Sequence, residues 1–304
     1  MLTTDRSDSP FDATFENHSY IRDFLLYFPT IDKYLEPERH DLGLGYPGSE
    51  HTGTSGLFIR NVELGGVFAG VGSVKTIPQL PAESTTHDMQ VDVRFNVDAS
   101  EATIVHKNEM SGYYASYWQN FHLYMNEDQR TQMYDALLGF LINGAHEKKI
   151  TVANAGLINF GVVPLQLQAE VTTNMFTHQA GDEVLFDLGS LIGPQMEMYA
   201  EEERLLPVDE YYQRRYTRTL TVSLPQGYVC RDLTSVNIDR ELVMDGKVLA
   251  SFRSNATLVD GKIEVTANEV YSTTHVPVEN FEAWRSVINA AADFNKVKLV
   301  LSKE

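Results

Sequence analysis

His18 and Glu36 are the residues near the N-terminus whose types and spacing could support acid–base chemistry. His18 ends the run Phe15-Glu-Asn-His18, and Glu36 closes a predicted hairpin over 21–36. A histidine on one strand and an acid at the end of the next can orient an imidazole beside a thiolate in cysteine enzymes. The acid accepts one ring N–H while the other ring nitrogen faces the thiol. Such chemistry requires a cysteine nucleophile.

Cys230 is the only cysteine among the 304 residues, and it lies in Gly227-Tyr-Val-Cys230 within a predicted β segment. A single cysteine excludes an internal disulfide framework and a zinc site built on cysteines. Nothing in its sequence context indicates a lowered thiol pKa. We therefore expect Cys230 to be a small buried apolar side chain rather than a nucleophile.

Motifs for cofactors and metals do not meet their structural requirements. The string Gly43-Leu-Gly45-Tyr-Pro-Gly48 matches a dinucleotide fingerprint, but no helix is predicted after its last glycine to receive a pyrophosphate. The nine histidines include no His-x-His or His-Glu-x-x-His pattern, and the chain has no Gly-x-Ser-x-Gly elbow. We therefore predict no cofactor and no metal site.

An aromatic cluster between 111 and 124 could bind a carbohydrate. Tyr113, Tyr117 and Trp118 are its proposed binding residues, because aromatic faces stack on the apolar side of sugar rings. The competing interpretation is that these rings form the core and rim of a β-sandwich.

Composition restricts the classes of partner. Asp and Glu number 42 against 24 Lys and Arg, for a formal charge of −18. Such a surface repels phosphate backbones and anionic lipids, so we expect no nucleic-acid partner. No apolar run approaches the ~18 residues that span a bilayer, so we expect no membrane insertion. The first residues lack the apolar region of a signal peptide.

The predicted elements are mostly strands. Period-two alternation predicts strands over 89–97 and 216–224, and Asp-Gly pairs at 245–246 and 260–261 predict type I′ hairpin turns. Further strands are expected over 103–106, 157–163, 165–173, 184–188 and 298–301. The fold class is therefore α+β and mainly β, with sandwich-like antiparallel sheets and two amphipathic helices over 127–146 and 278–294.

Several runs resemble bacterial transglutaminase-like multidomain proteins, in which β-rich domains flank a cysteine-enzyme core. The matching runs are Thr3–Ser7, Phe15–His18, Tyr27–Pro29, Lys33–Pro37, Leu224–Tyr228, the hairpin at 260–265 and Val276–Arg285. The resemblance implies that His18 is the triad histidine and Glu36 the triad acid. Glu36 stands where the family usually has Asp, and the helix that carries the family's cysteine lies upstream of the matched runs.

The resemblance sets the expected domains and function. It implies a remnant of the transglutaminase-like core with a linker over 1–82, a β-rich domain with one helix over 83–205, and a β-rich domain with hairpins and a C-terminal helix over 206–304. Alone, the chain is expected to be non-catalytic and to need an upstream polypeptide that supplies the cysteine. It would be periplasmic or in the cell envelope as part of a longer exported precursor, and cytoplasmic if complete as written. A module that binds an envelope glycan or a protein, and a structural or assembly role, are the alternatives.

Overall fold

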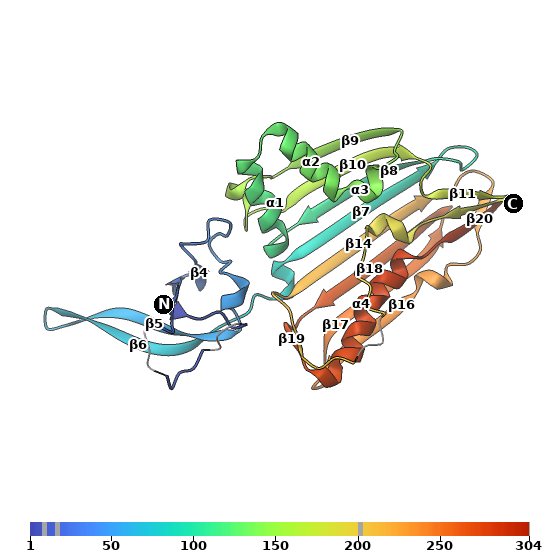
Figure 1. Cartoon of the computed structure of the whole chain (residues 1–304). Coiled ribbons are helices and arrows are strands. Elements are labelled where there is room, and N and C mark those ends of the chain that lie inside the picture. The colour runs from blue at the N-terminus through green and yellow to red at the C-terminus, as the bar shows by residue number, and fades with distance from the viewer. Residues whose placement is uncertain (8–10, 16–18, 200–202, 304) are drawn as a thin grey trace.

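The computed structural model describes residues 1–7, 11–15, 19–199 and 203–303. A large twisted sheet with helices on one face forms the body of the molecule, and a smaller N-terminal unit projects from one end (Figure 1). The predicted mainly-β α+β class is confirmed, because strands outweigh helices and nearly all strand pairs are antiparallel. Among the described residues, no helix is both long and apolar enough to cross a membrane.

The main sheet has eight strands in the order β16-β17-β18-β14-β7-β8-β10-β9. In chain order they are β7 (Thr86–Phe95), β8 (Ala102–Met110), β9 (Glu147–Ala153), β10 (Leu165–Thr173), β14 (Arg214–Ser223), β16 (Ile238–Met244), β17 (Lys247–Val259) and β18 (Lys262–Tyr271). Neighbours are antiparallel except β7 and β14, which run parallel at the centre. A crossover that includes the helices joins these two strands, as parallel pairing requires.

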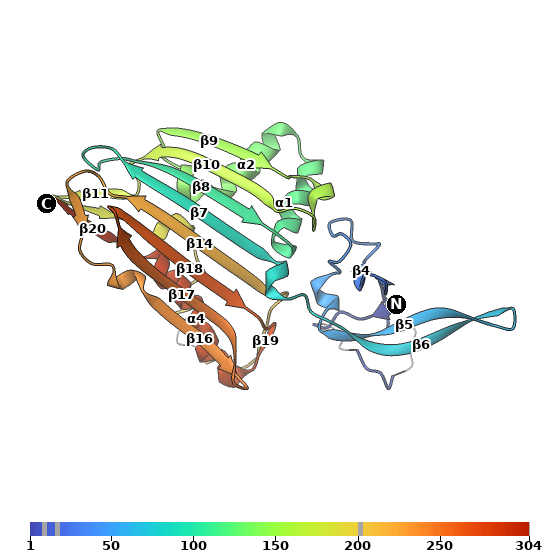
Figure 2. The same cartoon turned by 180° about the vertical axis from the view of Figure 1, so that it is seen from behind.

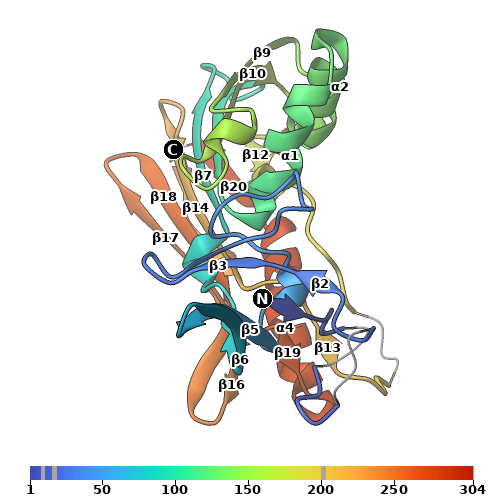
Figure 3. The ribbon, with the colours of Figure 1, turned by 90° about the vertical axis from the view of Figure 1, so that its left-hand side faces the viewer.

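One face of this sheet is buried and the other faces solvent. Along β7, Met89, Val91 and Val93 are buried, while Gln90 and Arg94 at alternate positions are exposed. This is the period-two pattern of a half-covered antiparallel sheet. Figures 2 and 3 show the bare face and the helical layer on the opposite side.

Among the described residues, four α-helices cover the buried face of the sheet: α1 (Tyr113–Tyr124), α2 (Glu127–Leu137), α3 (Gly139–Ile142) and α4 (Phe281–Asn295). The sequence predicted two helices. The expected helix over 127–146 is broken at Leu138, whose ψ of 7° leaves the helical range, and most of the aromatic segment 111–124 forms α1. Asn126 caps α2 in a reciprocal capping box with Gln129.

A second sheet of four short strands packs at the C-terminal end of the body. Its order is β11 (Thr177–Ala180), β12 (Glu183–Phe186), β20 (Leu299–Lys303) and β15 (Tyr228–Cys230). Phe186 and Leu301 from this sheet join the core beneath the main sheet, so this end is sandwich-like. The strand expected over 157–163 is wrong: Leu157–Asn159 is a 3₁₀ turn between Gly156 and Gly161, both at positive φ.

The two predicted Asp-Gly hairpins are confirmed. Asp245 and Gly246 have φ values of 51° and 72°, and Asp260 and Gly261 have values of 50° and 71°. Positive φ at both central residues is the type I′ geometry that matches the twist of the flanking strands. These turns fix the registers of β16, β17 and β18.

The N-terminal unit has its own small sheets. The larger has the order β2 (Asp23–Phe24), β1 (Leu2–Thr3), β5 (Thr54–Leu64), β6 (Val67–Ile77). β3 (Leu26–Phe28) and β4 (Lys33–Leu35) form the predicted hairpin over 21–36, which is confirmed. β5 and β6 form a long hairpin that extends away from the body (Figures 1 and 2).

Aromatic packing joins the N-terminal unit to the body. Tyr113 at the start of α1 lies edge-on to Tyr46 at 5.6 Å and stacks on Tyr212 at 5.2 Å. Arg6 donates to the backbone oxygens of Glu210 and Tyr211. The two-stranded pair β13 (Val208–Asp209) and β19 (His275–Val276) lies beside this junction. The predicted domain boundaries stay predictions; strands from both sides of residue 205 share one sheet and one core.

Candidate functional site

The side chain of Glu36 is only 10% exposed within the N-terminal unit, and His51 is the described histidine that faces it. His18, the predicted triad histidine, lies outside the described residues. Glu36 Oε2 accepts the Gly48 N–H at 2.7 Å, and Oε1 lies 3.5 Å from His51 Nε2. The other ring nitrogen of His51 is 3.3 Å from the Thr4 carbonyl oxygen. Both ring nitrogens therefore face acceptors, which favours the doubly protonated imidazolium.

The charges of Glu36 and His51 stabilise each other. Burial by itself would lower the pKa of His51, but the hydrogen bond and charge of Glu36 raise it above its ordinary value. Burial would likewise raise the pKa of Glu36, and the His51 and Gly48 hydrogen bonds bring it below its ordinary value. The pair is an internal ion pair that anchors the loop between β4 and β5.

Cys230 is buried in β15, as expected, and pairs in register with Leu301 of β20. Burial raises the pKa of its thiol. The sheet that holds it lies at the end of the body opposite the N-terminal unit (Figure 1). Within the part of the chain that the structure describes, no thiol therefore stands beside Glu36 and His51.

The predicted aromatic residues face in different directions around α1. Tyr113 is buried in the junction and donates its hydroxyl to the Pro47 oxygen at 2.6 Å. Trp118 is partly buried against the main core. Tyr117 is 54% exposed and packs on Phe121, with ring centroids 4.4 Å apart. The structure thus leaves Tyr117 available for a stacking contact, and carbohydrate binding stays a prediction.

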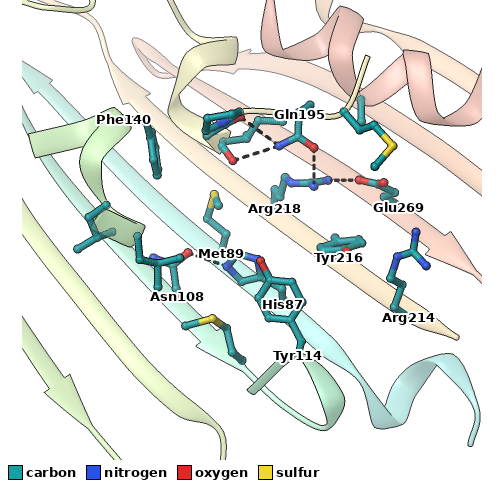
Figure 4. Close-up of a pocket in the computed structure, with 18 of the residues that line it drawn as sticks. His87, Met89, Asn108, Tyr114, Phe140, Gln195, Arg214, Tyr216, Arg218 and Glu269 are labelled. Carbon is teal, nitrogen blue, oxygen red and sulfur yellow. Dashed lines mark hydrogen bonds and ion pairs between the residues drawn. The ribbon is translucent and has the colours of Figure 1, made fainter. Parts of the chain in front are cut away.

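A cavity of about 320 Å³ lies between the main sheet and its helical cover. Its floor is formed by β8, β7, β14 and β18, and its roof by α2, α3, α4 and the segment 192–196 (Figure 4). The parallel register of the two central strands sets Tyr216 opposite His87 and Arg218 opposite Met89. The cavity therefore sits where the two halves of the sheet meet.

Arg218 is the centre of a buried polar network in the cavity floor. Its guanidinium donates to Glu269 Oε2 at 2.8 Å, and both side chains are less than a tenth exposed, at 5% and 7%. The second oxygen of Glu269 accepts the Tyr271 hydroxyl at 2.7 Å. Arg218 also donates to Gln195 Oε1 at 3.4 Å, which ties the floor to the roof. The buried charges are thus compensated and hydrogen-bonded, as burial of charge requires.

A chain of hydrogen bonds determines the protonation of two buried histidines. His106 Nε2 lies 3.0 Å from the Leu191 oxygen, which can only accept, so this nitrogen carries a proton. His106 Nδ1 then accepts from the Asn108 amide at 3.0 Å, and the Asn108 oxygen accepts from His87 Nε2 at 2.8 Å. Burial lowers the pKa of each histidine to about 4. Both rings are neutral near pH 7, and His87 Nδ1 is left as an acceptor.

Two tyrosines complete the polar end of the cavity. The Tyr114 ring stacks on His87 with centroids 5.0 Å apart, and the Tyr216 ring lies under Arg218 at 5.1 Å. Neither hydroxyl has a hydrogen-bond partner among residues 1–7, 11–15, 19–199 and 203–303, and both residues line the cavity (Figure 4). Burial raises the pKa of both phenols, so both hydroxyls stay protonated at neutral pH.

The positions of His87 and Arg218 along their strands are a sequence signal for this site. His87 has the same parity as Met89 and Val91, so it belongs to the buried face of its strand. Arg218 likewise alternates in phase with Leu220 and Val222. A cation or an imidazole on an otherwise apolar strand face indicates a buried partner. The sequence did not identify that partner, because Glu269 is 51 residues away along the chain from Arg218.

Comparisons with known proteins supply no family for this chain. No protein-family model matches the sequence, and no curated protein matches it. The geometry of the site is therefore the basis for assigning a function to this chain.

Proposed function

We propose that this chain is a binding module, non-catalytic on its own, that takes a small organic ligand into the cavity between the main sheet and its helices. The observation that carries the proposal is the pair of unused hydroxyls on Tyr114 and Tyr216. The neighbouring side chains Arg218, Glu269 and Asn108 are hydrogen-bonded within the protein. Neither hydroxyl is among the fully buried unpartnered side-chain atoms of the described residues, so both reach the space of the cavity and can donate to a ligand there.

The shape of the cavity supports a small molecule rather than a macromolecule. Its volume of about 320 Å³ falls at the lower end of the roughly 300–1,000 Å³ typical of ligand pockets. The polar side chains of the lining are those of the floor together with Gln195 of the roof and Tyr114 of α1, and the rest of the lining is largely aliphatic or aromatic. Such a pocket buries the body of a ligand and orients it with a few polar contacts.

A transglutaminase-like origin for the N-terminal unit is part of the proposal. Its support is the hairpin that ends in a buried acid, Glu36, and the imidazole of His51 that faces this acid. Acyl transfer would require a thiol at this position, and Cys230 is buried at the other end of the molecule. The purified chain is therefore expected to show neither acyl transfer nor amide hydrolysis.

Ligand binding can be tested with methionine methyl groups as reporters. Met89 and Met110 line the cavity, whereas Met244 lies on the edge strand β16 outside it. In methyl-labelled protein, a panel of small neutral, anionic and cationic organic molecules is expected to include compounds that shift the first two signals saturably and leave the third unchanged. Ala291→Leu, which extends a lining side chain of α4 into the cavity, should abolish the shifts. If no compound shifts Met89 or Met110, the proposed function is wrong.

A further inference from the structure

The charged groups at the cavity are already neutralised by other protein groups. Arg218 is paired with Glu269, and Arg214 donates to both carboxylate oxygens of Glu210 at 3.0 and 3.3 Å. An anionic ligand would have to compete with these carboxylates for their cations. A cationic ligand would have to compete with the arginines. Because an unpaired charge is expensive to remove from water, this arrangement disfavours both kinds of ligand.

The uncharged polar groups are complementary to a ligand that both donates and accepts. His87 Nδ1 is an acceptor, because the proton on Nε2 is committed to Asn108. The hydroxyls of Tyr114 and Tyr216 can donate, and none of these three groups has a protein partner among the described residues. A carboxamide matches this set, since its N–H groups suit the imidazole and its carbonyl oxygen suits a phenol.

The rest of the cavity lining accepts an apolar body. The side chains that line it share an aliphatic or aromatic character: Met110, Leu137, Phe140, Ile192 and Ile288. Methionines and an aromatic ring adapt to ligands of different shape. An aliphatic chain or a small ring attached to the polar head would therefore bury its surface here.

We propose that the cavity binds an uncharged, amide-headed organic molecule with an apolar body, whose head group forms hydrogen bonds with Tyr114, Tyr216 and His87. This inference rests on the proposed function and adds the class of ligand. The polar head lies over the seam between β7 and β14, and the apolar body contacts the aliphatic and aromatic side chains around it. Recognition is by hydrogen bonds between neutral groups.

The test uses three probes of one chain length: hexanamide, hexanoate and hexylammonium. Titrations at pH 7 follow the Met89 and Met110 methyl signals, with Met244 as reference. The signal shifts caused by hexanamide are expected to saturate, and its affinity is expected to be at least tenfold above that of either charged probe. Tyr114→Phe and Tyr216→Phe each remove one hydroxyl. Each is expected to lower the affinity for hexanamide about fivefold to tenfold, which is the effect of one lost hydrogen bond. Tyr124→Phe is the matched control, because Tyr124 is also on α1 but is 71% exposed and outside the cavity.

The outcomes separate the two proposals. If hexanoate or hexylammonium binds as tightly as hexanamide, the ligand class is wrong while the binding function stands. If both Tyr→Phe variants bind hexanamide as tightly as the parent does, the phenols form no hydrogen bond with the head group and the inference is overturned. If no probe moves the Met89 or Met110 signals, and the wider panel also fails, the proposed function falls as well. The methyl spectra of the variants report in the same experiment whether they are folded.

Discussion

Arg218 and Glu269 form an ion pair across two neighbouring strands without being directly opposite. Glu269 is in register with Tyr216, and Arg218 is in register with Ala267. The guanidinium therefore reaches its partner diagonally, over the Tyr216 ring. The diagonal places the charges beneath the helices and leaves the phenol of Tyr216 at the cavity.

Removing one member of this pair should be strongly destabilising. Glu269→Gln leaves the Arg218 charge buried without a counter-ion, and a loss of about 3–5 kcal/mol in the free energy of unfolding is expected. The double variant Arg218→Met/Glu269→Gln should recover part of this loss. Asp239→Asn, which breaks an exposed pair with Arg253, is the control and should cost at most about 1 kcal/mol. Urea unfolding measures all four proteins, and equal losses for Glu269→Gln and Asp239→Asn would contradict the buried pair.

His87 and His106 should remain neutral well below the ordinary histidine pKa. Their pKa values of about 4 lie below the reference of 6.5, so the unfolded chain binds more protons between these values. Their contribution to stability is therefore complete above about pH 6.5 and is lost as the pH falls toward 4. Long-range ¹H–¹⁵N spectra should show both rings protonated at Nε2 only, from pH 7 to pH 5. An Nδ1-protonated tautomer on either ring would contradict the hydrogen-bond chain.

Glu36→Gln should weaken the N-terminal unit in a defined pH range. The folded pKa of Glu36 is below its reference of 4.5, so its contribution is complete above that value and is lost as the pH falls through the folded pKa. The folded pKa of His51 is above its reference of 6.5, so its contribution is complete below that value and is lost as the pH rises through the folded pKa.

The difference between parent and Glu36→Gln should therefore be largest between about pH 4.5 and 6.5, at about 1–3 kcal/mol. The Gly48 amide donates a hydrogen bond to Glu36, so its hydrogen exchange reports local opening of this unit at each pH. A difference that does not change from pH 5.5 to pH 9 would rule out the ion pair.

Gly189→Ala should push the roof segment around 189–196 away from the end of α4. A Cβ at this position would lie 2.0 Å from the Phe294 carbonyl oxygen, which cannot move without disturbing the helix. We expect the free energy of unfolding to fall by about 3 kcal/mol. Hexanamide binding should also be lost, because the adjoining Leu191 carbonyl and Ile192 form part of the site. Gly70→Ala is the control, since its Cβ would meet only Ile59 at an ordinary 3.4 Å. Unchanged stability of Gly189→Ala would contradict this close packing.

The aromatic residues of α1 should separate into structural and surface positions. Trp118→Ala removes a ring packed on the core and should cost roughly 2 kcal/mol or more, whereas Tyr117→Ala should change stability by less than about 0.5 kcal/mol. If the carbohydrate hypothesis is right, Tyr117→Ala alone will lose retention on an immobilised glycan while unfolding as the parent does. Retention that is unchanged in Tyr117→Ala would count against this role for Tyr117.

Local patterns in the sequence were sufficient for the elements whose conformation depends on near neighbours. The Asp-Gly turns at 245–246 and 260–261 were predictable because two adjacent positive φ values favour those residues. The strand alternation that includes Met89 and Val91 was visible because one face is buried. The long helix predicted over 127–146 failed because its apolar stripe continues past Leu138, where packing against the sheet bends the backbone.

The cavity, in contrast, was decided by the tertiary structure. It depends on the parallel pairing of β7 with β14, whose partners Met89 and Arg218 are separated by more than a hundred residues. Periodicity assigns a residue to a face of its strand, but it contains no information on which distant strand lies alongside. By itself, the sequence determined that His87 and Arg218 belong to apolar faces. Only the long-range strand order brought those faces together over one cavity and gave Arg218 its partner Glu269.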